Sequence, residues 1–379
     1  MFLKSNKIGK KVLVAMSGGV DSSVAALLLK NKGYNIAGGF IRGYNVDGCQ
    51  DRDAEDARLV CEKIGIPFYV FNFEDEYKNR VVDYLLDGYK KGITPNPDVV
   101  CNREIKFGLL YDAAMNLGFD FIASGHYARI KREIPNNKFQ ISNWLKEKEA
   151  HIYAAKDKNK DQSYFLWDIP KEKLEHLIFP LGKMTKPEVR KIAKKSGLPV
   201  ADKKDSQGIC FLGKFDFGDF LREKIKTKIG DIIDVNGKKV GEHDGVWLYT
   251  IGQKHGFKNF SGEPFYVIGK DLKKNELIVA YEGDGKLFCK EFEVTDLNFL
   301  DDKTKKDFES GKEIKVFIRN RYRQPLFGAT LTLLDNPHKS VSLSALIRVD
   351  VPHQLFPASG QSTVFYNRRG QMLGGGVII

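Results

Sequence analysis

A glycine- and serine-rich stretch near the start of the chain is the first place where the residue types predict chemistry. Residues 17–23 read SGGVDSS; the apolar run Lys11–Met16 precedes them, and apolar residues at helical spacing follow. The stretch therefore joins an expected buried strand to the start of a helix. Two glycines let a ligand approach the backbone, and the N–H groups of a first helical turn favour an anion. We interpret it as a phosphate-binding loop, in which Asp21 would contact a phosphate through a cation such as Mg²⁺.

Two cysteines have surroundings in which a thiol could react. Cys101 follows residues 94–98 (TPNPD), whose two prolines predict an extended or turning loop, and helical spacing begins at about Cys101. The start of a helix favours the thiolate form, and Asp98 would lie one turn away. Cys210 is flanked by glycines in a segment expected to be flexible and accessible. Considered alone, the first segment could equally be a proline-rich connector with a buried cysteine.

The remaining cysteines carry no such signal. Cys61 lies on the apolar face of an expected helix, so we interpret it as structural. Cys49 lies in a glycine-containing loop, and its meaning is left open, with a bystander favoured. Five scattered cysteines without a Cys-x-x-Cys pair argue against a disulfide framework, a zinc ribbon and a cysteine-held iron–sulfur cluster.

Composition narrows the class of protein. The chain has 379 residues, enough for two or three domains, and its net charge is +12 with a pI of about 9.2. Such a charge is typical of a protein that meets nucleic acid, although a lysine-rich solvated surface explains it almost as well. No apolar run approaches the ~18 residues of a membrane helix, and the first residues lack a signal core. We expect a cytoplasmic protein without membrane attachment.

The order of elements predicts an α/β fold. Strand patterns at 34–42, 66–73 and 120–124 alternate with helix patterns at 51–64 and 77–91. This rhythm indicates a doubly wound parallel sheet, which binds ligands at the carboxyl ends of its strands. There, Gly125 would let a nucleotide come close. After Cys210, alternating runs around tight turns predict small β modules or a barrel.

Taken together, the motifs resemble those of the tRNA-specific 2-thiouridylase family, a branch of the PP-loop ATP pyrophosphatases, and the match spans nearly the whole chain. It rests on 17–23 (SGGVDSS), 94–98 with Cys101 and Asn102, 124–129 (SGHYAR), 160–166 (KDQSYFL), 205–211 (DSQGICF), 249–253 (YTIGQ), 321–324 (RYRQ), 360–361 and 374–376. The resemblance implies a PP-loop catalytic domain at 1–205, a small central β-rich domain at 206–275, and a C-terminal β-barrel that binds tRNA at 276–379.

The resemblance also implies an activity and a set of partners. ATP would adenylate the C2 oxygen of the wobble uridine, U34, in the tRNA anticodon. Sulfur would then arrive from a protein persulfide, giving 2-thiouridine, AMP and pyrophosphate, with Mg²⁺ as cofactor. A cysteine desulfurase or a relay protein would supply the persulfide.

Site residues follow from the matching motifs. The residues that would hold ATP are Ala15, Met16, Ser17, Gly18, Gly19, Val20, Asp21, Ser22, Ile41 and Gly125. Those that would contact tRNA are Asn96, Pro97 and Asp98 at the target base, with Lys160, Asp161, Gln162, Arg321 and Tyr322 elsewhere. Cys101 would be the nucleophile, Cys210 the persulfide carrier, and Asp98 a general acid–base.

Two departures and two alternatives accompany this interpretation. Ile41 stands where the family often has methionine, which affects only fine affinity, and the segment 143–150 is longer than expected. One alternative is a PP-loop amide ligase of the argininosuccinate- or GMP-synthetase type, which needs neither Cys101 nor Cys210. The other is a non-catalytic RNA-binding protein that keeps a relict nucleotide loop.

Overall fold

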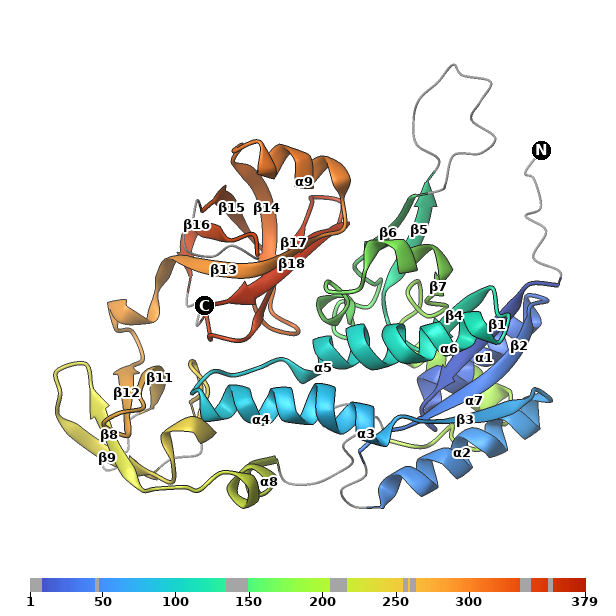
Figure 1. Cartoon of the computed structure of the whole chain (residues 1–379), viewed down its shortest axis with the longest axis horizontal. Helices are drawn as coiled ribbons and strands as arrows, with labels where there is room; N and C mark the ends of the chain where they lie inside the picture. Colours follow the sequence, from blue (N-terminus) through green and yellow to red (C-terminus); the bar gives the residue numbers. More distant parts are fainter. Residues whose placement is uncertain are drawn as a thin grey trace. The chain divides into compact units, whose positions relative to one another are not determined.

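The computed structural model describes residues 9–44, 48–133, 149–204, 217–254, 258–259, 264–334, 342–353 and 357–379 (Figure 1). Cys210 and residues 143–148 lie outside the described residues, as does the side chain of Cys49. The chain forms two compact units. The first comprises 1–80, 98–214 and 369–372, and the second comprises 81–97, 215–368 and 373–379.

A parallel sheet forms the centre of the first unit, as the sequence predicts. Its order is β3-β2-β1-β4-β7, and every neighbouring pair is parallel. The strands are β1 (Lys11–Met16), β2 (Asn35–Arg42), β3 (Phe68–Asn72), β4 (Phe121–Ser124) and β7 (Leu177–Ile178). In the centre of this sheet, Ala15 pairs with Gly39 on one side and with Ser124 on the other. The glycine-rich loop therefore leaves the sheet between two strands whose carboxyl ends flank it.

Three helices share a core with one face of this sheet: α1 (Val20–Asn31), α2 (Cys49–Ile64) and α7 (Lys186–Lys195). Alternate β1 residues Val12, Val14 and Met16 enter that core, because successive strand residues point to opposite faces. The start of α7 has a capping box, in which Thr185 and Glu188 satisfy each other's backbone N–H groups. A hairpin of β5 (Arg129–Glu133) and β6 (Glu149–Tyr153) and the 3₁₀ turns η4 (Ser163–Phe165) and η5 (Lys171–His176) complete the described part of this unit.

The region between β3 and β4 corrects one prediction. It contains α3 (Glu74–Tyr77), the π-helical segment η1 (Lys78–Val82), α4 (Asp83–Lys90), α5 (Pro97–Val100), the π-helical segment η2 (Cys101–Leu109) and α6 (Leu110–Asn116). The helix expected to begin at about Cys101 begins at Pro97 instead. Proline is accepted in a first helical turn because the N–H it lacks has no intrahelical partner there.

The second unit contains two β structures. The first is a sheet of order β10-β9-β8-β12-β11. Its elements are α8 (Phe217–Lys224), β8 (Gly230–Asp234), β9 (Lys239–His243), η6 (Val246–Leu248), β10 (Lys258–Asn259), β11 (Phe265–Asp271), β12 (Glu276–Tyr281) and η7 (Gly285–Leu287). A turn at Asn236-Gly237 joins β8 and β9 into a hairpin, and Gly237 has φ +82° there.

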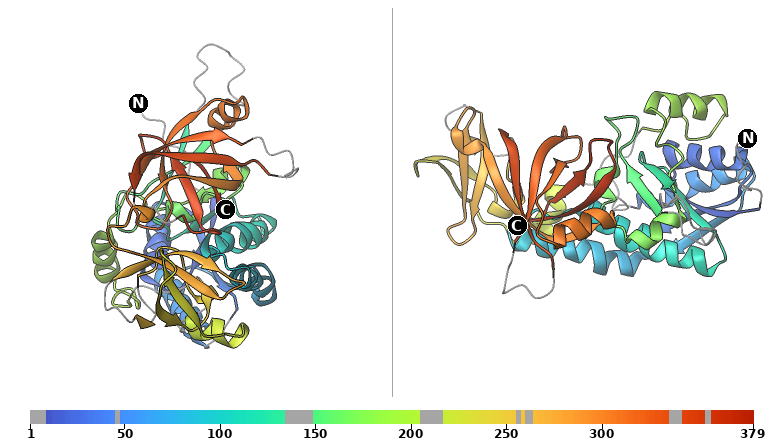
Figure 2. Two further views of the ribbon diagram at one scale, coloured as in Figure 1. Left: turned by 90° about the vertical axis from the view of Figure 1, so that its left-hand side faces the viewer. Right: turned by 90° about the horizontal axis from the view of Figure 1, so that it is seen from above.

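The second β structure is a closed barrel of order β13-β16-β15-β14-β17-β18 (Figure 2). Its elements are β13 (Cys289–Phe299), α9 (Asp302–Glu309), β14 (Ile314–Arg319), β15 (Phe327–Leu333), β16 (Ala345–His353), β17 (Ser362–Tyr366) and β18 (Met372–Ile378). The predicted fold class, a doubly wound parallel sheet followed by a small β-rich part and a C-terminal barrel, is confirmed. In the part of the chain that the structure describes, no helix is both long and apolar enough to cross a membrane.

Candidate active site

The loop after β1 is shaped to receive an anion. Gly18 has φ +67°, and a side chain there would collide with the backbone carbonyl of Asp53. Gly19 caps α1 without a side-chain hydrogen bond, so no capping side chain occupies the N–H groups of the first turn. Ser22 Oγ accepts a hydrogen bond from Ser17 N at 3.1 Å, and Ser23 Oγ donates to Gly19 O at 2.7 Å. The loop is therefore closed by its own serines.

The other predicted nucleotide residues surround this loop. Ala15, Met16, Val20 and Ser22 are buried at the end of β1 and the start of α1, and Ile41 near the end of β2 is 1% exposed. A β-carbon on Gly125 would lie 2.7 Å from Ser22 N and 2.8 Å from the carbonyl carbon of Asp21. The first turn of α1 therefore requires glycine at position 125. Nucleotide contact by these residues stays a prediction.

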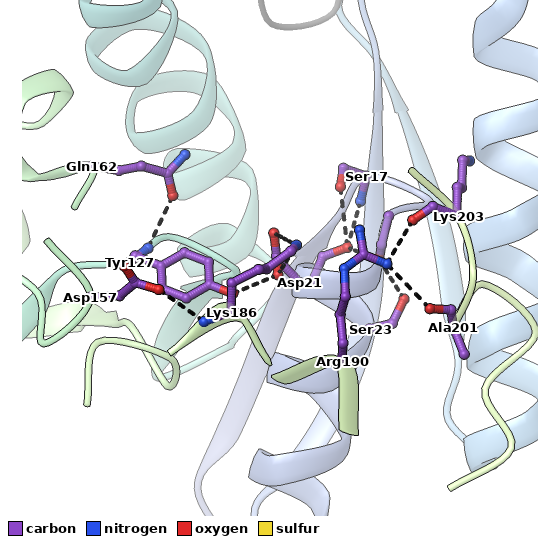
Figure 3. Close-up of polar contacts among 12 residues, drawn as sticks. Ser17, Asp21, Ser23, Tyr127, Asp157, Gln162, Lys186, Arg190, Ala201 and Lys203 are labelled. Carbon is purple, nitrogen blue, oxygen red and sulfur yellow. Dashed lines mark hydrogen bonds and ion pairs between the residues drawn. The ribbon is translucent and has the colours of Figure 1, made fainter. Parts of the chain in front are cut away.

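Asp21 is held by two side chains that the sequence analysis did not assign to the site. Lys186 Nζ lies 2.7 Å from each oxygen of the Asp21 carboxylate, and the Tyr127 hydroxyl donates to Oδ1 at 2.9 Å (Figure 3). Tyr127 stands in the recognised motif 124–129 and Lys186 in the capping box at the start of α7, but only the fold shows that they meet Asp21. Among the described residues, no cluster of three histidine, cysteine or acidic side chains could hold a metal. Because the Lys186 ammonium already contacts both carboxylate oxygens of Asp21, this carboxylate does not fit as a direct Mg²⁺ ligand.

A second lysine fixes the loop from the other side. Lys203 Nζ donates to Gly18 O at 3.0 Å and contacts Asp53 at 2.7 Å and Asp56 at 2.5 Å. Burial alone would lower the pKa of Lys203, but the hydrogen bonds to the two carboxylates outweigh it and raise the pKa. Lys203 therefore joins the phosphate loop to the first turns of α2.

Cys101 is 0% exposed and lies inside a helical run rather than at its start. Asp98 precedes it by three residues, a spacing that puts both side chains on one helical face. The helix is anchored by Asn102, whose Nδ2 donates to Phe165 O at 3.1 Å and whose Oδ1 accepts from Lys106 Nζ at 3.1 Å. Because the helical run begins at Pro97, Cys101 lies one turn inside it, and the expected position of Cys101 at the helix start is not observed.

Residues 160–162 are predicted to contact tRNA. Two of them, Asp161 and Gln162, form hydrogen bonds with neighbouring parts of the chain. Gln162 and Tyr127 exchange two hydrogen bonds: Gln162 N donates to Tyr127 O at 2.8 Å, and Tyr127 N donates to Gln162 Oε1 at 3.0 Å. Asp161 is 2% exposed, and its carboxylate accepts from Ala155 N at 3.0 Å and from Ser163 N at 3.2 Å. In this arrangement the Asp161 carboxylate binds protein backbone, whereas Lys160 is partly exposed.

A buried histidine lies beside the same segment. His126 Nδ1 is 2.7 Å from Ser124 Oγ, and its ring packs against Phe107 and Phe179. Burial, and secondly the charge of Lys106, hold the pKa of His126 well below its usual range. We therefore expect a neutral imidazole throughout the physiological pH range.

The remaining predicted residues belong to the second unit. Asn96 is buried, and its Nδ2 donates to Ser362 Oγ at 3.4 Å. Gln361 Nε2 donates to the carbonyl oxygens of Thr94 at 3.0 Å and Pro95 at 3.2 Å. These bonds attach the loop before Pro97 to the start of β17.

Arg321 and Tyr322 are partly exposed in the turn after β14. The Arg321 guanidinium donates to the Ile251 carbonyl, and the Arg323 guanidinium lies 5.0 Å from the centre of the Tyr322 ring.

Comparison with known proteins decides the family. Family models described as the tRNA methyl transferase HUP domain, the tRNA methyl transferase PRC-barrel domain and the aminomethyltransferase beta-barrel domain match residues 10–214, 218–281 and 289–378. A protein of Lactiplantibacillus plantarum named tRNA-specific 2-thiouridylase MnmA is 41% identical over 382 residues, covering 97% of this chain and 95% of its own. This chain belongs to the tRNA-specific 2-thiouridylase family.

Two further members of the 2-thiouridylase family are similar to this chain to the same degree. The relative from Lactobacillus johnsonii is 42% identical, covering 97% of this chain and 95% of its own. The relative from Geobacillus kaustophilus is 41% identical, covering 97% of this chain and 94% of its own. The predicted family and the prediction of an enzyme are confirmed.

Proposed function

We propose that this chain converts the wobble uridine of tRNA, U34, to 2-thiouridine, using ATP and a persulfide. The observation that carries the proposal is the identity of 41–42% over 97% of the chain to proteins named tRNA-specific 2-thiouridylases. The described site agrees with it chemically, because one folded unit holds both a loop suited to phosphate and a helix that carries a cysteine.

The first step activates an unreactive carbon. C2 of uridine is a urea-like carbonyl and therefore a poor electrophile. Its oxygen attacks the α-phosphorus of ATP and pyrophosphate leaves, so that AMP becomes the leaving group on C2. The residues proposed to bind ATP are Ala15, Met16, Ser17, Gly18, Gly19, Val20, Asp21, Ser22, Ile41 and Gly125. The N–H groups at the start of α1 would stabilise the charge that develops on the pyrophosphate.

The second step moves sulfur by thiol–disulfide chemistry. The terminal sulfur of a persulfide on Cys210 attacks C2, AMP departs, and C2 is left joined to Cys210 through an S–S bond. The Cys101 thiolate then attacks the Cys210 sulfur, which releases the thiocarbonyl and leaves a Cys101–Cys210 disulfide. Two electrons from cellular thiols reset that disulfide. Asp98, on the same helical face as Cys101, would transfer protons.

Burial of Cys101 adds a requirement to this scheme. The thiol is 0% exposed, so it must become accessible before it can attack another cysteine. We infer that binding of tRNA opens the surroundings of the Cys101 helix, and the rate at which Cys101 is alkylated with and without tRNA measures this directly.

Partners and domain roles follow from the same proposal. Asn96, Pro97 and Asp98 would contact the target base, while Lys160, Gln162, Arg321 and Tyr322 would contact tRNA elsewhere, with Asp161 holding that segment in shape. The domains would be catalytic at 1–205, central at 206–275 and tRNA-binding at 276–379. A cysteine desulfurase or relay protein would load Cys210, in the cytoplasm.

One reaction tests the function. The purified chain is incubated with unmodified tRNA, ATP, Mg²⁺ and a persulfide donor, and digested nucleosides are analysed by mass spectrometry. We expect 2-thiouridine, with AMP and pyrophosphate formed in equal amounts. A methylated nucleoside in its place would support the chemistry in the family models' description, and pyrophosphate exchange that requires a small acid would support an amide ligase. Binding of tRNA without any product would support the non-catalytic alternative.

A further inference from the structure

We propose that Lys186 is a positioning residue for ATP, which neutralises Asp21 so that the phosphate loop can accept a triphosphate without a magnesium ion on that carboxylate. This inference rests on the proposed use of ATP. It assigns Lys186 a role toward Asp21, and it changes the role of Asp21.

The geometry supports an ion pair that is held in place from both sides. Lys186 Nζ is 2.7 Å from both carboxylate oxygens of Asp21, and the exposed fractions of the two side chains are 10% and 34%. Lys186 is the first residue of α7, and its backbone N–H donates to Asp157 Oδ2 at 2.9 Å. Both ends of the pair lie on helices that pack against each other, since α7 packs on α1, which carries Asp21.

Charge explains why the phosphate loop needs such a partner. Asp21 lies in the first turn of α1, where the N–H groups that would bind phosphate also lie. A carboxylate there repels a triphosphate, and the repulsion is large because the site is only partly solvated. With the lysine ammonium on both oxygens, the pair is neutral overall, and the positive end of the helix dipole acts on the phosphates undiminished.

The same geometry argues against Asp21 as a magnesium ligand. Mg²⁺ is usually held by one or two carboxylates together with substrate phosphates and several waters. Here a cation already bridges both oxygens, and Tyr127 donates a third hydrogen bond to Oδ1 at 2.9 Å. A divalent ion on this carboxylate would lie beside the lysine ammonium. We therefore expect Mg²⁺ to enter on the phosphates of the nucleotide.

A double-mutant cycle separates the two roles. Calorimetry measures binding of an ATP analogue with a methylene bridge between the α- and β-phosphates, with Mg²⁺ and with a chelator in its place. The proteins are the wild type, Lys186→Met, Asp21→Asn and the double variant, with the exposed Lys191→Met on the same helix as a control. Thermal unfolding of every variant is measured alongside.

Neutralisation by Lys186 predicts a distinct pattern. Lys186→Met should weaken analogue binding at least about tenfold, because a part-buried carboxylate is left uncompensated. The double variant should return to within about threefold of the wild type, since both charges are gone. Asp21→Asn alone should keep the wild-type ratio of affinities with and without Mg²⁺, and Lys191→Met should bind as the wild type does.

Other outcomes overturn the proposal. If Asp21→Asn abolishes the effect of Mg²⁺ while Lys186→Met retains it, Asp21 is a metal ligand. If Lys186→Met has a lower melting temperature than the wild type, and the double variant does not recover affinity for the ATP analogue, the ion pair is only structural. Failure of the wild type to bind the analogue under any condition would count against the proposed function itself, not against Lys186 alone.

Discussion

Asn102 and Phe165 join the cysteine-bearing helix to the phosphate loop through a short series of bonds. Asn102 Nδ2 donates to Phe165 O at 3.1 Å, and Phe165 N donates to Gln162 O at 3.1 Å. Gln162 is bonded to Tyr127, whose hydroxyl reaches Asp21. The two halves of the proposed reaction, activation and sulfur transfer, therefore share one support inside the first unit.

Removing this link should affect sulfur transfer more than nucleotide binding. Asn102 is 3% exposed, so Asn102→Ala leaves the Phe165 carbonyl without this buried donor and should cost about 1–3 kcal/mol of stability. We expect the rate of 2-thiouridine formation to fall strongly while affinity for the ATP analogue changes less than about threefold. The exposed Asn116→Ala at the end of α6 is the matched control. An unchanged thiolation rate would show that the position of the Cys101 helix does not depend on this bond.

Gly125→Ala should damage the phosphate loop by steric conflict. Its new β-carbon would lie 2.7 Å from Ser22 N, which is backbone and can move only with the first turn of α1. Overpacking of this kind typically costs about 1–3 kcal/mol, and we expect analogue affinity to fall by at least about tenfold. Gly285→Ala, where no atom lies within 4 Å of the new β-carbon, is the control. Equal nucleotide affinities for the two variants would contradict this account.

The cysteines should differ in both reactivity and function. Cys101→Ser and Cys210→Ser should each abolish 2-thiouridine, whereas Cys61→Ser and Cys289→Ser should retain it. Burial raises the pKa of the Cys61 thiol to about 12, so alkylating reagents should leave it unmodified in the folded chain. Cys101, which is 0% exposed, should be alkylated slowly without tRNA and faster when tRNA is bound. Peptide mass spectrometry after a timed iodoacetamide pulse measures this, and equal rates with and without tRNA would argue against opening.

Adenylation should survive loss of the persulfide carrier. Because activation needs the phosphate loop and a seated uridine but no thiol, Cys210→Ser should still transfer label from α-labelled ATP to tRNA. Gel separation of tRNA from free nucleotide measures the transfer. Absence of label would mean that Cys210 also orders the site before activation.

Binding of tRNA should weaken steeply with salt. Each lysine or arginine contact with a phosphate contributes about one unit to the slope of log affinity against log salt concentration. Arg323→Ala and Arg321→Ala should each lower that slope, and Arg323 is the clearer test because Arg321 also donates to the Ile251 carbonyl. Lys303→Ala on α9 is the comparison variant. Filter binding between low and moderate salt gives the slopes, and identical values would place the tRNA-binding surface elsewhere.

Lys270 should make stability rise with pH above neutrality. Its Nζ donates to Gly92 O at 3.0 Å, and burial lowers its pKa from 10.5 to about 8. Between these values the unfolded chain binds one more proton than the folded chain, so raising the pH favours folding by on the order of 1 kcal/mol per pH unit. Relative to Lys270→Met, the wild type should gain melting temperature across that window. The exposed Lys273→Met should show no such difference.

Local patterns in the sequence determined much of the architecture. The spacing of apolar residues around 17–23 was enough to place a strand, a loop and a helix, because each of those elements depends on nearby residues. The capping box at Thr185 and the hairpin at Asn236-Gly237 were predictable for the same reason. Prolines were harder to interpret, since the same residue breaks a helix interior and starts a first turn, and Pro97 does the latter.

The tertiary structure decided which distant side chains meet. Asp21 and Lys186 are 165 residues apart, and no local pattern predicts that the start of α7 brings an ammonium to the phosphate loop. Likewise, the sequence marked Cys101 as reactive, but its burial depends on tertiary packing. Residue type and short-range spacing set the chemistry that is available, whereas charge neutralisation and access depend on contacts between elements far apart in the chain, which only folding creates.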